Sequence, residues 1–245
     1  FLYADFNGQI NYTTPNMNGL ELTVGIDQPM STNNLGNTAV EYAANAVAAG
    51  GVQTFSVTTA AETLSLNASG TQKNPAFVGV ARYSFTANDV TGKIWVEGKS
   101  QKIYGLSGFS ANSSVAGIGA NVNAGGFGAV AYYYKGDGVG TTVIGGNNHS
   151  SGAKRDSDGG YLQGTYTLPT KTKIGLAVAT SKLDRAAGEA SGLLVKENKR
   201  YTAGAYHPLT KHLNLVAEYN DIESRVHNGN KGESQTGSLG AILFF

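Results

Sequence analysis

The sequence predicts an all-β fold, an antiparallel meander of strands that crosses a membrane as a β-barrel. Three observations support this fold class. Segments of alternating apolar and polar residues recur along almost the whole chain. Charged residues make up only 14% of the 245 residues and Gly contributes 34, whereas roughly a quarter of the residues are charged in soluble domains. The connections between the segments are alternately short and long, which is typical of strands whose ends lie on two sides of a membrane.

Eleven segments have the length and the alternation of β-strands. The second of them begins with Leu20 and Leu22 on one side and Glu21 and Thr23 on the other. Because a strand points successive side chains to opposite faces, this pattern gives one apolar and one polar face. The expected strands are residues 7–14, 20–28, 75–86, 92–103, 114–124, 127–135, 160–168, 172–182, 197–207, 212–222 and 234–245.

The same alternation marks the later strands in the order of the chain. Their apolar sides include Ile94/Val96, Ile118/Ala120/Val122, Leu162/Tyr166/Leu168, Ile174/Leu176/Val178 and Leu213/Leu215/Ala217/Tyr219. Their polar sides include Glu97/Lys99, Asn121/Asn123, Gln163/Thr165/Thr167 and Asn214/Glu218. Helical spacing occurs only at residues 38–50, TAVEYAANAVAAG, which form an Ala-rich stretch inside a long connection. The sequence contains no run of 18 apolar residues, so it offers no transmembrane helix.

The lengths of the connections separate the two ends of the strands. Short connections are expected at residues 15–19, 87–92, 124–126, 169–172 and 209–212, and long ones at residues 29–74, 104–113, 136–159, 183–196 and 223–233. The long connections are polar and rich in Gly, Ser and Asn. A soluble β-sandwich has no physical reason to keep such an alternation, whereas a transmembrane barrel has short turns on one side and long loops on the other.

Aromatic residues gather close to the short connections. Tyr12, Phe85, Phe127, Tyr166 and Tyr206 each lie within about three residues of a short turn. An amphipathic ring suits the boundary between lipid and water, so we expect these residues to form a membrane-interface girdle at one rim. We place Phe245 in the same group, because the last alternating strand ends on this aromatic residue.

Four stretches carry a resemblance to a known family. They are GQINYTTPNMNGLELTVGI, GGFGAVAYYYKGDGVGT, KRYTAGAYHPLTKHLNLVAEYND and the C-terminal GAILFF, and they run from the start to the end of the chain. In this order they resemble the Gram-negative general porins of the sixteen-stranded trimeric type, close to the betaproteobacterial porins. The resemblance implies the bacterial outer membrane as location, contact with the bilayer and outer-membrane lipids, and a homotrimer. It also implies a non-enzymatic, water-filled channel for passive diffusion of ions and small hydrophilic solutes.

The number of expected strands departs from this family pattern. Eleven is odd, and bacterial single-chain barrels have even numbers of strands. If the terminal strand is the sixteenth, the first expected strand is the sixth. Residues 1–245 then form a single barrel domain from which the N-terminal strands are absent. Either the chain is the C-terminal part of a longer porin, or a second chain completes the barrel, or the count is wrong by one.

If the apolar face contacts lipid, the polar face lines water. The candidate pore-lining residues on that face are Asn11, Arg82, Glu97, Lys99, Asn121, Gln163, Arg200 and Glu218. In the family that the chain resembles, basic residues on the wall face acidic residues on an inner loop, and a ring of charges selects ions by their sign. Asn11 stands where that family often has Arg, which predicts weak selectivity. The competing interpretation is that these charges only hydrate a wide lumen.

Other chemistry finds little support in the sequence. The four His residues lack metal-ligand spacing, and the chain has no Cys. Residues 136–146, GDGVGTTVIGG, lack the Lys-Ser/Thr pair of a phosphate-binding loop, and DSDGG at 156–160 is read as a hydrated loop. There is no G-x-S-x-G nucleophile elbow, and a net charge of +1 favours no nucleic acid. We therefore expect no catalytic residues, cofactor, metal site or nucleic-acid partner.

Two alternative functions stay open at this point. The first is an outer-membrane β-barrel that sheathes or docks a partner protein and has a structural or binding role. It predicts a partner that co-purifies and no free conductance. The second is a soluble β-sandwich with a hydrated outer face, which predicts extraction without detergent.

Overall fold

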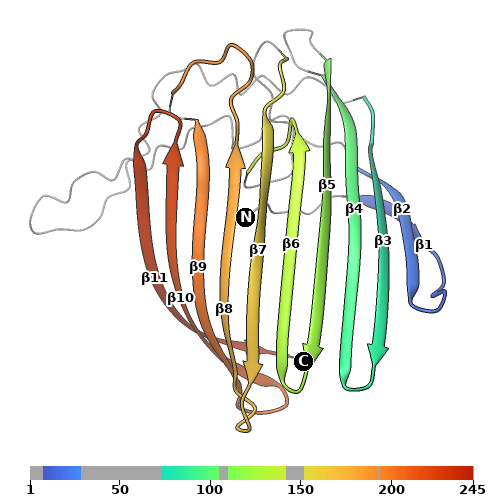
Figure 1. Cartoon of the computed structure of the whole chain (residues 1–245), viewed down its shortest axis with the longest axis vertical. Coiled ribbons are helices and arrows are strands. Elements are labelled where there is room, and N and C mark those ends of the chain that lie inside the picture. The colour runs from blue at the N-terminus through green and yellow to red at the C-terminus, as the bar shows by residue number, and fades with distance from the viewer. Residues whose placement is uncertain (1–7, 29–72, 105–109, 142–151, 193, 245) are drawn as a thin grey trace, which may run out of the picture.

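The computed structural model describes residues 8–28, 73–104, 110–141, 152–192 and 194–244. All regular structure in these ranges is β-strand, in one 11-stranded antiparallel sheet in which each strand pairs with its neighbour in sequence (Figure 1). The strands are Gln9–Thr13 (β1), Leu20–Asp27 (β2), Ala76–Ala87 (β3), Val90–Tyr104 (β4), Ser110–Ala124 (β5), Phe127–Asp137 (β6), Asp156–Thr167 (β7), Lys173–Leu183 (β8), Val195–Pro208 (β9), Leu213–Val226 (β10) and Lys231–Leu243 (β11). The predicted antiparallel meander is confirmed, with β1 and β11 at the two edges of the described sheet.

The pairing register keeps the apolar residues of all strands on one face. Ile10 pairs with Ile26, which in turn pairs with Phe77, and at the other end of the sheet Ala217 pairs with Leu239. Directly paired residues point to the same side of an antiparallel sheet. We call this side the apolar face. Its larger exposed residues include Ile10, Tyr12, Leu22, Val24, Ile26, Phe77, Tyr83, Ile94, Val96, Ile118, Val122, Phe127, Tyr133, Leu162, Ile174, Leu176, Val178, Tyr201, Leu215, Tyr219 and Leu239.

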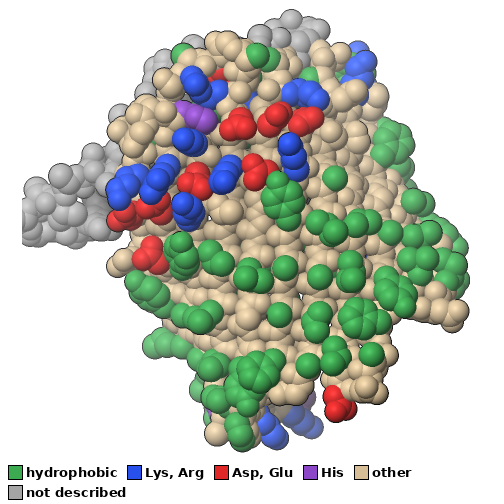
Figure 2. Space-filling model, in the orientation of Figure 1, with side chains coloured by type: hydrophobic (Ala, Val, Ile, Leu, Met, Phe, Trp, Pro, Cys, Tyr) green, Lys and Arg blue, Asp and Glu red, His purple; other side chains and the backbone are tan. Residues whose placement is uncertain are grey.

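No second protein layer covers the apolar face in the described part of the chain. Leu239 is 89% exposed, Ile10 75% and Leu176 69%. Figure 2 shows hydrophobic side chains in a broad band, with charged side chains collected above it, toward one end of the strands. Soluble proteins rarely expose an apolar area of this kind. A sheet whose surroundings are lipid requires one, because each lipid-facing strand presents an apolar side to the hydrocarbon.

The two ends of the strands carry different connections. On one end, which we call the turn side, the connections are residues 14–19, 88–89, 125–126, 168–172 and 209–212. Two of them have only two residues, and one of these uses Gly125 and Gly126, with φ of 54° and 86°. Positive φ at both positions gives the twist that joins adjacent antiparallel strands through two residues, and Gly adopts it without steric cost.

On the opposite end, the loop side, two connections that were predicted to be long are short. Residues 223–233 were expected to be a long loop, but β10 continues to Val226 and β11 begins at Lys231, so only residues 227–230 connect them. The connection between β4 and β5 is also short, at residues 105–109. The remaining three, residues 28–75, 138–155 and 184–194, are long. The strict alternation of short and long connections therefore holds for three of the five loop-side connections.

Several strands extend further toward the loop side than the sequence pattern predicts. β5 begins at Ser110 and β7 at Asp156, several residues earlier than expected. Near these ends both faces of the sheet are polar, as in Asp156, Ser157 and Asp158. The alternation of apolar and polar residues stops where the lipid-facing part of the strand ends. The backbone hydrogen bonds between the strands continue beyond that point. The helical stretch expected at residues 38–50 lies outside the described residues.

The few fully buried side chains lie close to the loop side. Ile103 is near the end of β4, Tyr134 lies in the second half of β6, and Leu183 ends β8. Val139 and Ala186 belong to the adjoining connections. The buried apolar side chains are thus confined to the loop-side part of the sheet, and the rest of the sheet is a single layer.

The described residues contain no helix that is long and apolar enough to cross a membrane.

Candidate functional site

The candidate site is the polar face of the sheet, opposite the apolar face. All eight residues named from the sequence belong to it: Asn11, Arg82, Glu97, Lys99, Asn121, Gln163, Arg200 and Glu218. The pairing register of the strands shows on which face each residue lies. Arg82 pairs with Glu21 and with Trp95, and none of these three shares a face with the apolar Leu22 or Ile94. The polar side chains therefore form one continuous surface across the eleven strands.

Two basic residues of this surface have carboxylate partners on β2. The Lys99 Nζ lies 2.8 Å from Asp27 Oδ2, with both side chains close to 10% exposed. Arg82 Nη1 lies 3.7 Å from Glu21 Oε2, and this pair is about one-third exposed. The first pair is therefore shielded from water, whereas the second is largely hydrated and contributes little to stability.

Both acidic candidates accept hydrogen bonds from tyrosines on a neighbouring part of the wall. The Tyr132 hydroxyl donates to Glu97 Oε1 at 2.5 Å. The Tyr206 hydroxyl donates to Glu218 Oε1. Tyr206 pairs with Val216 and Lys173, so it lies on the polar face. Tyr206 was expected in the membrane-interface girdle, but it lies on the polar face. Its position near a turn determines its height along the strands but not the face on which it lies.

Arg200 is fixed by a short network on β9 and β10. Its Nη2 and Nε atoms donate to Asn220 Oδ1 at 2.7 and 3.0 Å, and Nε also lies 3.1 Å from Thr202 Oγ1. Thr202 Oγ1 donates to the same Asn220 oxygen at 2.8 Å. Because no carboxylate takes part in these bonds, they orient the guanidinium charge without neutralising it.

The remaining candidates are amides, and two of them, Asn11 and Asn121, form hydrogen bonds with another amide on the same strand. Asn123 Nδ2 donates to Asn121 Oδ1 at 2.8 Å, and Asn11 Nδ2 donates to Gln9 Oε1 at 2.6 Å. Gln163 pairs in register with Val130. The polar face as a whole mixes both signs of charge with neutral amides and hydroxyls, and no single sign dominates it.

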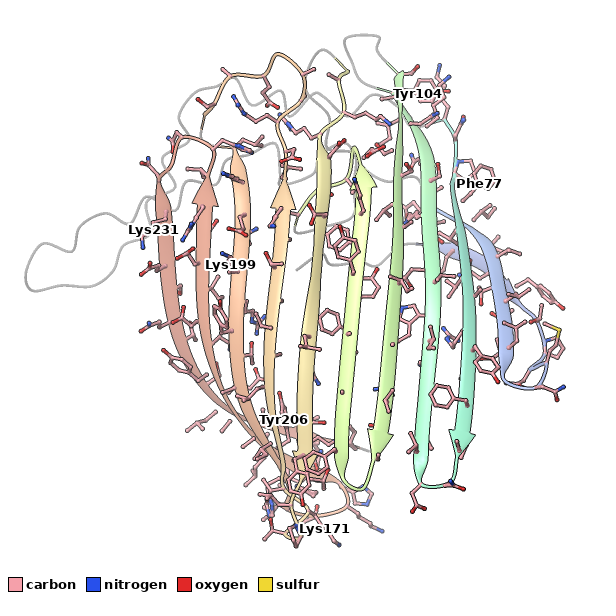
Figure 3. The ribbon with its side chains drawn as sticks, in the orientation of Figure 1. Phe77, Tyr104, Lys171, Lys199, Tyr206 and Lys231 are labelled. Carbon is pink, nitrogen blue, oxygen red and sulfur yellow. The ribbon has the colours of Figure 1, made fainter. Side chains whose placement is uncertain are left out.

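Four of the aromatic residues expected at a membrane interface belong to the apolar face. Tyr12 and Phe127 are exposed there by more than 60%. Phe127 packs on Tyr166 with ring centroids 4.4 Å apart, and Phe85 lies 6.5 Å from Tyr83. Figure 3 shows the turn-side position of Lys171 and Tyr206, far from Lys199 and Lys231 near the loop side. Phe245 lies outside the described residues.

Sequence reasoning missed several residues of the polar face. They are Trp95, Tyr132, Tyr161 and Asn220. The signal was present in strand parity, since Trp95 alternates with Glu97 and Lys99 on β4. Trp95 was overlooked because an aromatic residue in a lipid-spanning strand is expected on the lipid side.

Two loop-side connections are joined by an ion pair that has no sequence signature. Arg155 Nη2 and Nε lie 2.5 and 3.0 Å from the two carboxylate oxygens of Glu189, and both side chains are largely buried. The backbone N–H of Ala186 donates to Glu189 Oε2 at 2.9 Å. This bidentate contact connects residue 155, before β7, to the connection between β8 and β9. Among the described residues, no three His, Asp or Glu side chains are placed to hold a metal ion.

A meander with one exposed apolar face, one charged face and every internal strand paired on both sides defines the wall of a transmembrane β-barrel. The comparison with protein families agrees. Residues 4–227 match the family described as Gram-negative porin, and the chain belongs to that family. This membership places the protein in the outer membrane of a Gram-negative bacterium, in contact with membrane lipid. None of the curated proteins matches the sequence.

Solved structures of outer-membrane proteins share the fold. The outer membrane channel DcaP of Acinetobacter baumannii has a TM-score of 0.67 and 13% identity, over 96% of this chain and 62% of the other. An anion-selective porin from Comamonas acidovorans has a TM-score of 0.54 and 12% identity, over 96% and 57%. A further porin has a TM-score of 0.51 and 13% identity, over 98% and 63%. The chain thus spans about three-fifths of the length of these structures.

Proposed function

We propose that the protein forms a water-filled channel for the passive diffusion of ions and small hydrophilic solutes across the outer membrane. The observation that carries the proposal is the continuous polar face. It holds Arg, Lys, Glu and Asn side chains on all parts of a wall whose other face is apolar. Charged groups on a membrane-spanning strand are tolerated only where they face water, so this face requires an aqueous lumen. Membership of the Gram-negative porin family supports the same function.

In this proposal the eight polar-face residues line the pore, and Tyr12, Phe85, Phe127 and Tyr166 form the interface girdle. The mixture of charges in the Lys99–Asp27 and Arg82–Glu21 pairs supports weak ion selectivity. The protein acts as a channel and not as an enzyme, and it requires no cofactor.

We further propose that other strands pair with β1 and β11 to close a sixteen-stranded barrel within a single domain. Unpaired strand edges in lipid leave backbone N–H and C=O groups without partners, which is energetically prohibitive. The chain covers 57–63% of the solved porins, which supports this view. The additional strands come from a longer form of the polypeptide or from a second chain, and three barrels assemble as a homotrimer.

The test is single-channel recording in a planar bilayer with protein extracted from outer membranes in mild detergent. We expect stable openings that close in three equal steps, one for each barrel of a trimer. Silent, folded protein with a co-purifying partner in the lumen would contradict the channel and support a sheathing role. Closure in a single step would be consistent with the channel proposal but would contradict the proposed trimer.

A further inference from the structure

Three aromatic side chains form a row on the polar face, which we call the aromatic row: Trp95, Tyr132 and Tyr161. They come from β4, β6 and β7 and share one register row, in which Trp95 pairs with Gly119, Gly119 with Tyr132, and Tyr132 with Tyr161. The ring centroids are 6.2 Å apart for the first pair and 5.9 Å for the second, with interplanar angles of 19° and 30°. The three rings are therefore nearly parallel neighbours across four strands.

Glycines on β5 make room for this row. A Cβ atom on Gly119 would lie 2.1 Å from Trp95 Cζ2, and one on Gly117 would lie 2.3 Å from the Tyr132 hydroxyl oxygen. The indole and the phenol therefore lie over the bare β5 backbone, where any other residue would push them away. All three residues of the row are half-buried.

Polar groups border the aromatic row. Glu97 Oε1 accepts a hydrogen bond from the Tyr132 hydroxyl at 2.5 Å, and Lys93 Nζ lies over the Trp95 ring, 5.8 Å from its centroid. Arg82 is the direct cross-strand neighbour of Trp95, and it is paired with Glu21. Acidic and basic side chains occur in similar numbers around the row, so an anionic solute gains little from the local charge.

We propose that the aromatic row is a binding site for the pyranose ring of a neutral sugar, within the channel proposed above. A pyranose has an apolar C–H face that packs on an aromatic ring, and a rim of hydroxyl groups that bind carboxylates, phenols and cationic donors. The row supplies flat apolar surface, and Glu97, Lys93 and Arg82 supply the polar partners at its border. Binding sites of this kind combine apolar contact with a few placed polar groups. This inference rests on the proposed channel function.

Trp95 makes the site directly measurable, because it is the only Trp among the 245 residues. Intrinsic Trp fluorescence of the protein in mild detergent is titrated with maltotriose, and separately with sorbitol, a neutral hexitol without a ring. We expect a saturable change of emission with maltotriose and none with sorbitol. Identical responses to the two compounds, or no saturation, would overturn the proposal.

Variants on neighbouring faces locate the binding. Tyr161→Leu removes one ring and keeps the Trp95 reporter, so we expect about tenfold weaker maltotriose binding, as for the loss of one stacking partner. Tyr132→Phe keeps the ring and removes the hydroxyl, and it provides a second test if Tyr161→Leu does not fold. The matched control is Tyr133→Leu, the next residue on β6, which lies on the apolar face. Equal affinity in Tyr161→Leu and Tyr133→Leu would overturn the assignment.

Planar-bilayer recordings separate this inference from the channel itself. We expect maltotriose to interrupt the current of the open channel, and Tyr161→Leu to shorten these interruptions. Open channels that maltotriose never interrupts, together with flat fluorescence titrations, would overturn the sugar site and leave the channel proposal intact. Saturable binding of maltotriose to a protein that never conducts would overturn the channel proposal but would support the sugar-binding site. Tighter binding of benzoate than of maltotriose would show that the row takes anionic aromatic solutes, and would overturn the assignment to neutral sugars.

Discussion

Gly119 illustrates how one residue on β5 controls the geometry of a side chain on β4. A Cβ atom there would meet the six-membered ring of Trp95, whereas one on Gly164 would have no atom within 4 Å. Both glycines lie inside strands, Gly119 on the polar face and Gly164 on the apolar face. The difference predicts very different outcomes for the same substitution.

Gly119→Ala is expected to displace the Trp95 indole from the β5 backbone toward water. The emission maximum of the single Trp should then shift to longer wavelength, and maltotriose binding should weaken. Gly164→Ala serves as the control, and its free energy of unfolding should change by less than about 0.5 kcal/mol. Unchanged emission in Gly119→Ala would mean that the indole does not lie over this glycine.

Arg82 and Lys99 allow a test of the polar face as the pore lining. Arg82→Glu and Lys99→Gln both remove positive charge from this face, so the reversal potential in a salt gradient should move toward cation preference. Lys231→Glu is the control, because Lys231 lies on the other face, is paired with Glu233 and is more than half exposed. The pore-lining assignment fails if both polar-face variants keep the wild-type reversal potential.

At the scale of the strands, the two faces differ in the solvent they meet. Leu176 on β8 is 69% exposed and lies on the apolar face, with Gly164 and Ala203 as its cross-strand neighbours. Gln163 on β7 lies on the polar face, close to the same height. An introduced charge therefore meets hydrocarbon at one position and water at the other.

Leu176→Arg is expected to lower the free energy of unfolding by about 1–3 kcal/mol, the cost of Arg between the interface and the middle of a bilayer. Gln163→Arg should change it by less than about 1 kcal/mol. The measurement is reversible unfolding by denaturant in lipid vesicles, followed through Trp95 fluorescence. Equal destabilisation by the two substitutions would contradict the assignment of the faces.

The same strands show what the sequence reveals and what it hides. The period-two alternation of apolar and polar residues located all eleven strands and placed all eight candidates on the polar face. It could do so because a strand with lipid on one side and polar groups on the other must alternate in this way. It missed the loop-side ends of β5 and β7, where both faces are polar and alternation has no cause. It also misplaced Tyr206 and overlooked Trp95, since an aromatic residue is compatible with either face and only the register decides.

For the whole molecule, the turn side and the loop side must lie on opposite sides of the membrane. The 245 residues contain no Cys, so they give no background labelling when a single Cys is introduced among them. Asp89 lies in the tight connection between β3 and β4, and Ala187 lies in the connection between β8 and β9, and both are exposed.

A bulky maleimide that cannot pass the pore should label Ala187→Cys on intact cells. It should label Asp89→Cys only after the outer membrane is permeabilised, because short turns face the periplasm. Both variants should react equally once the protein is solubilised in detergent, which controls for access to the thiol. Labelling of Asp89→Cys on intact cells would reverse the orientation.

The meander also has a consequence for the time course of folding. Every strand finds its partner next to it in sequence, so most pairings close only a small loop and lose little chain entropy. The pairing of β2 with β3 is the exception, because residues 28–75 separate them, whereas residues 88–89 separate β3 from β4. The difference in closure entropy is about 3 kcal/mol. The β1–β2 hairpin is therefore expected to join the sheet last, as a late kinetic phase that shortening this connection would accelerate.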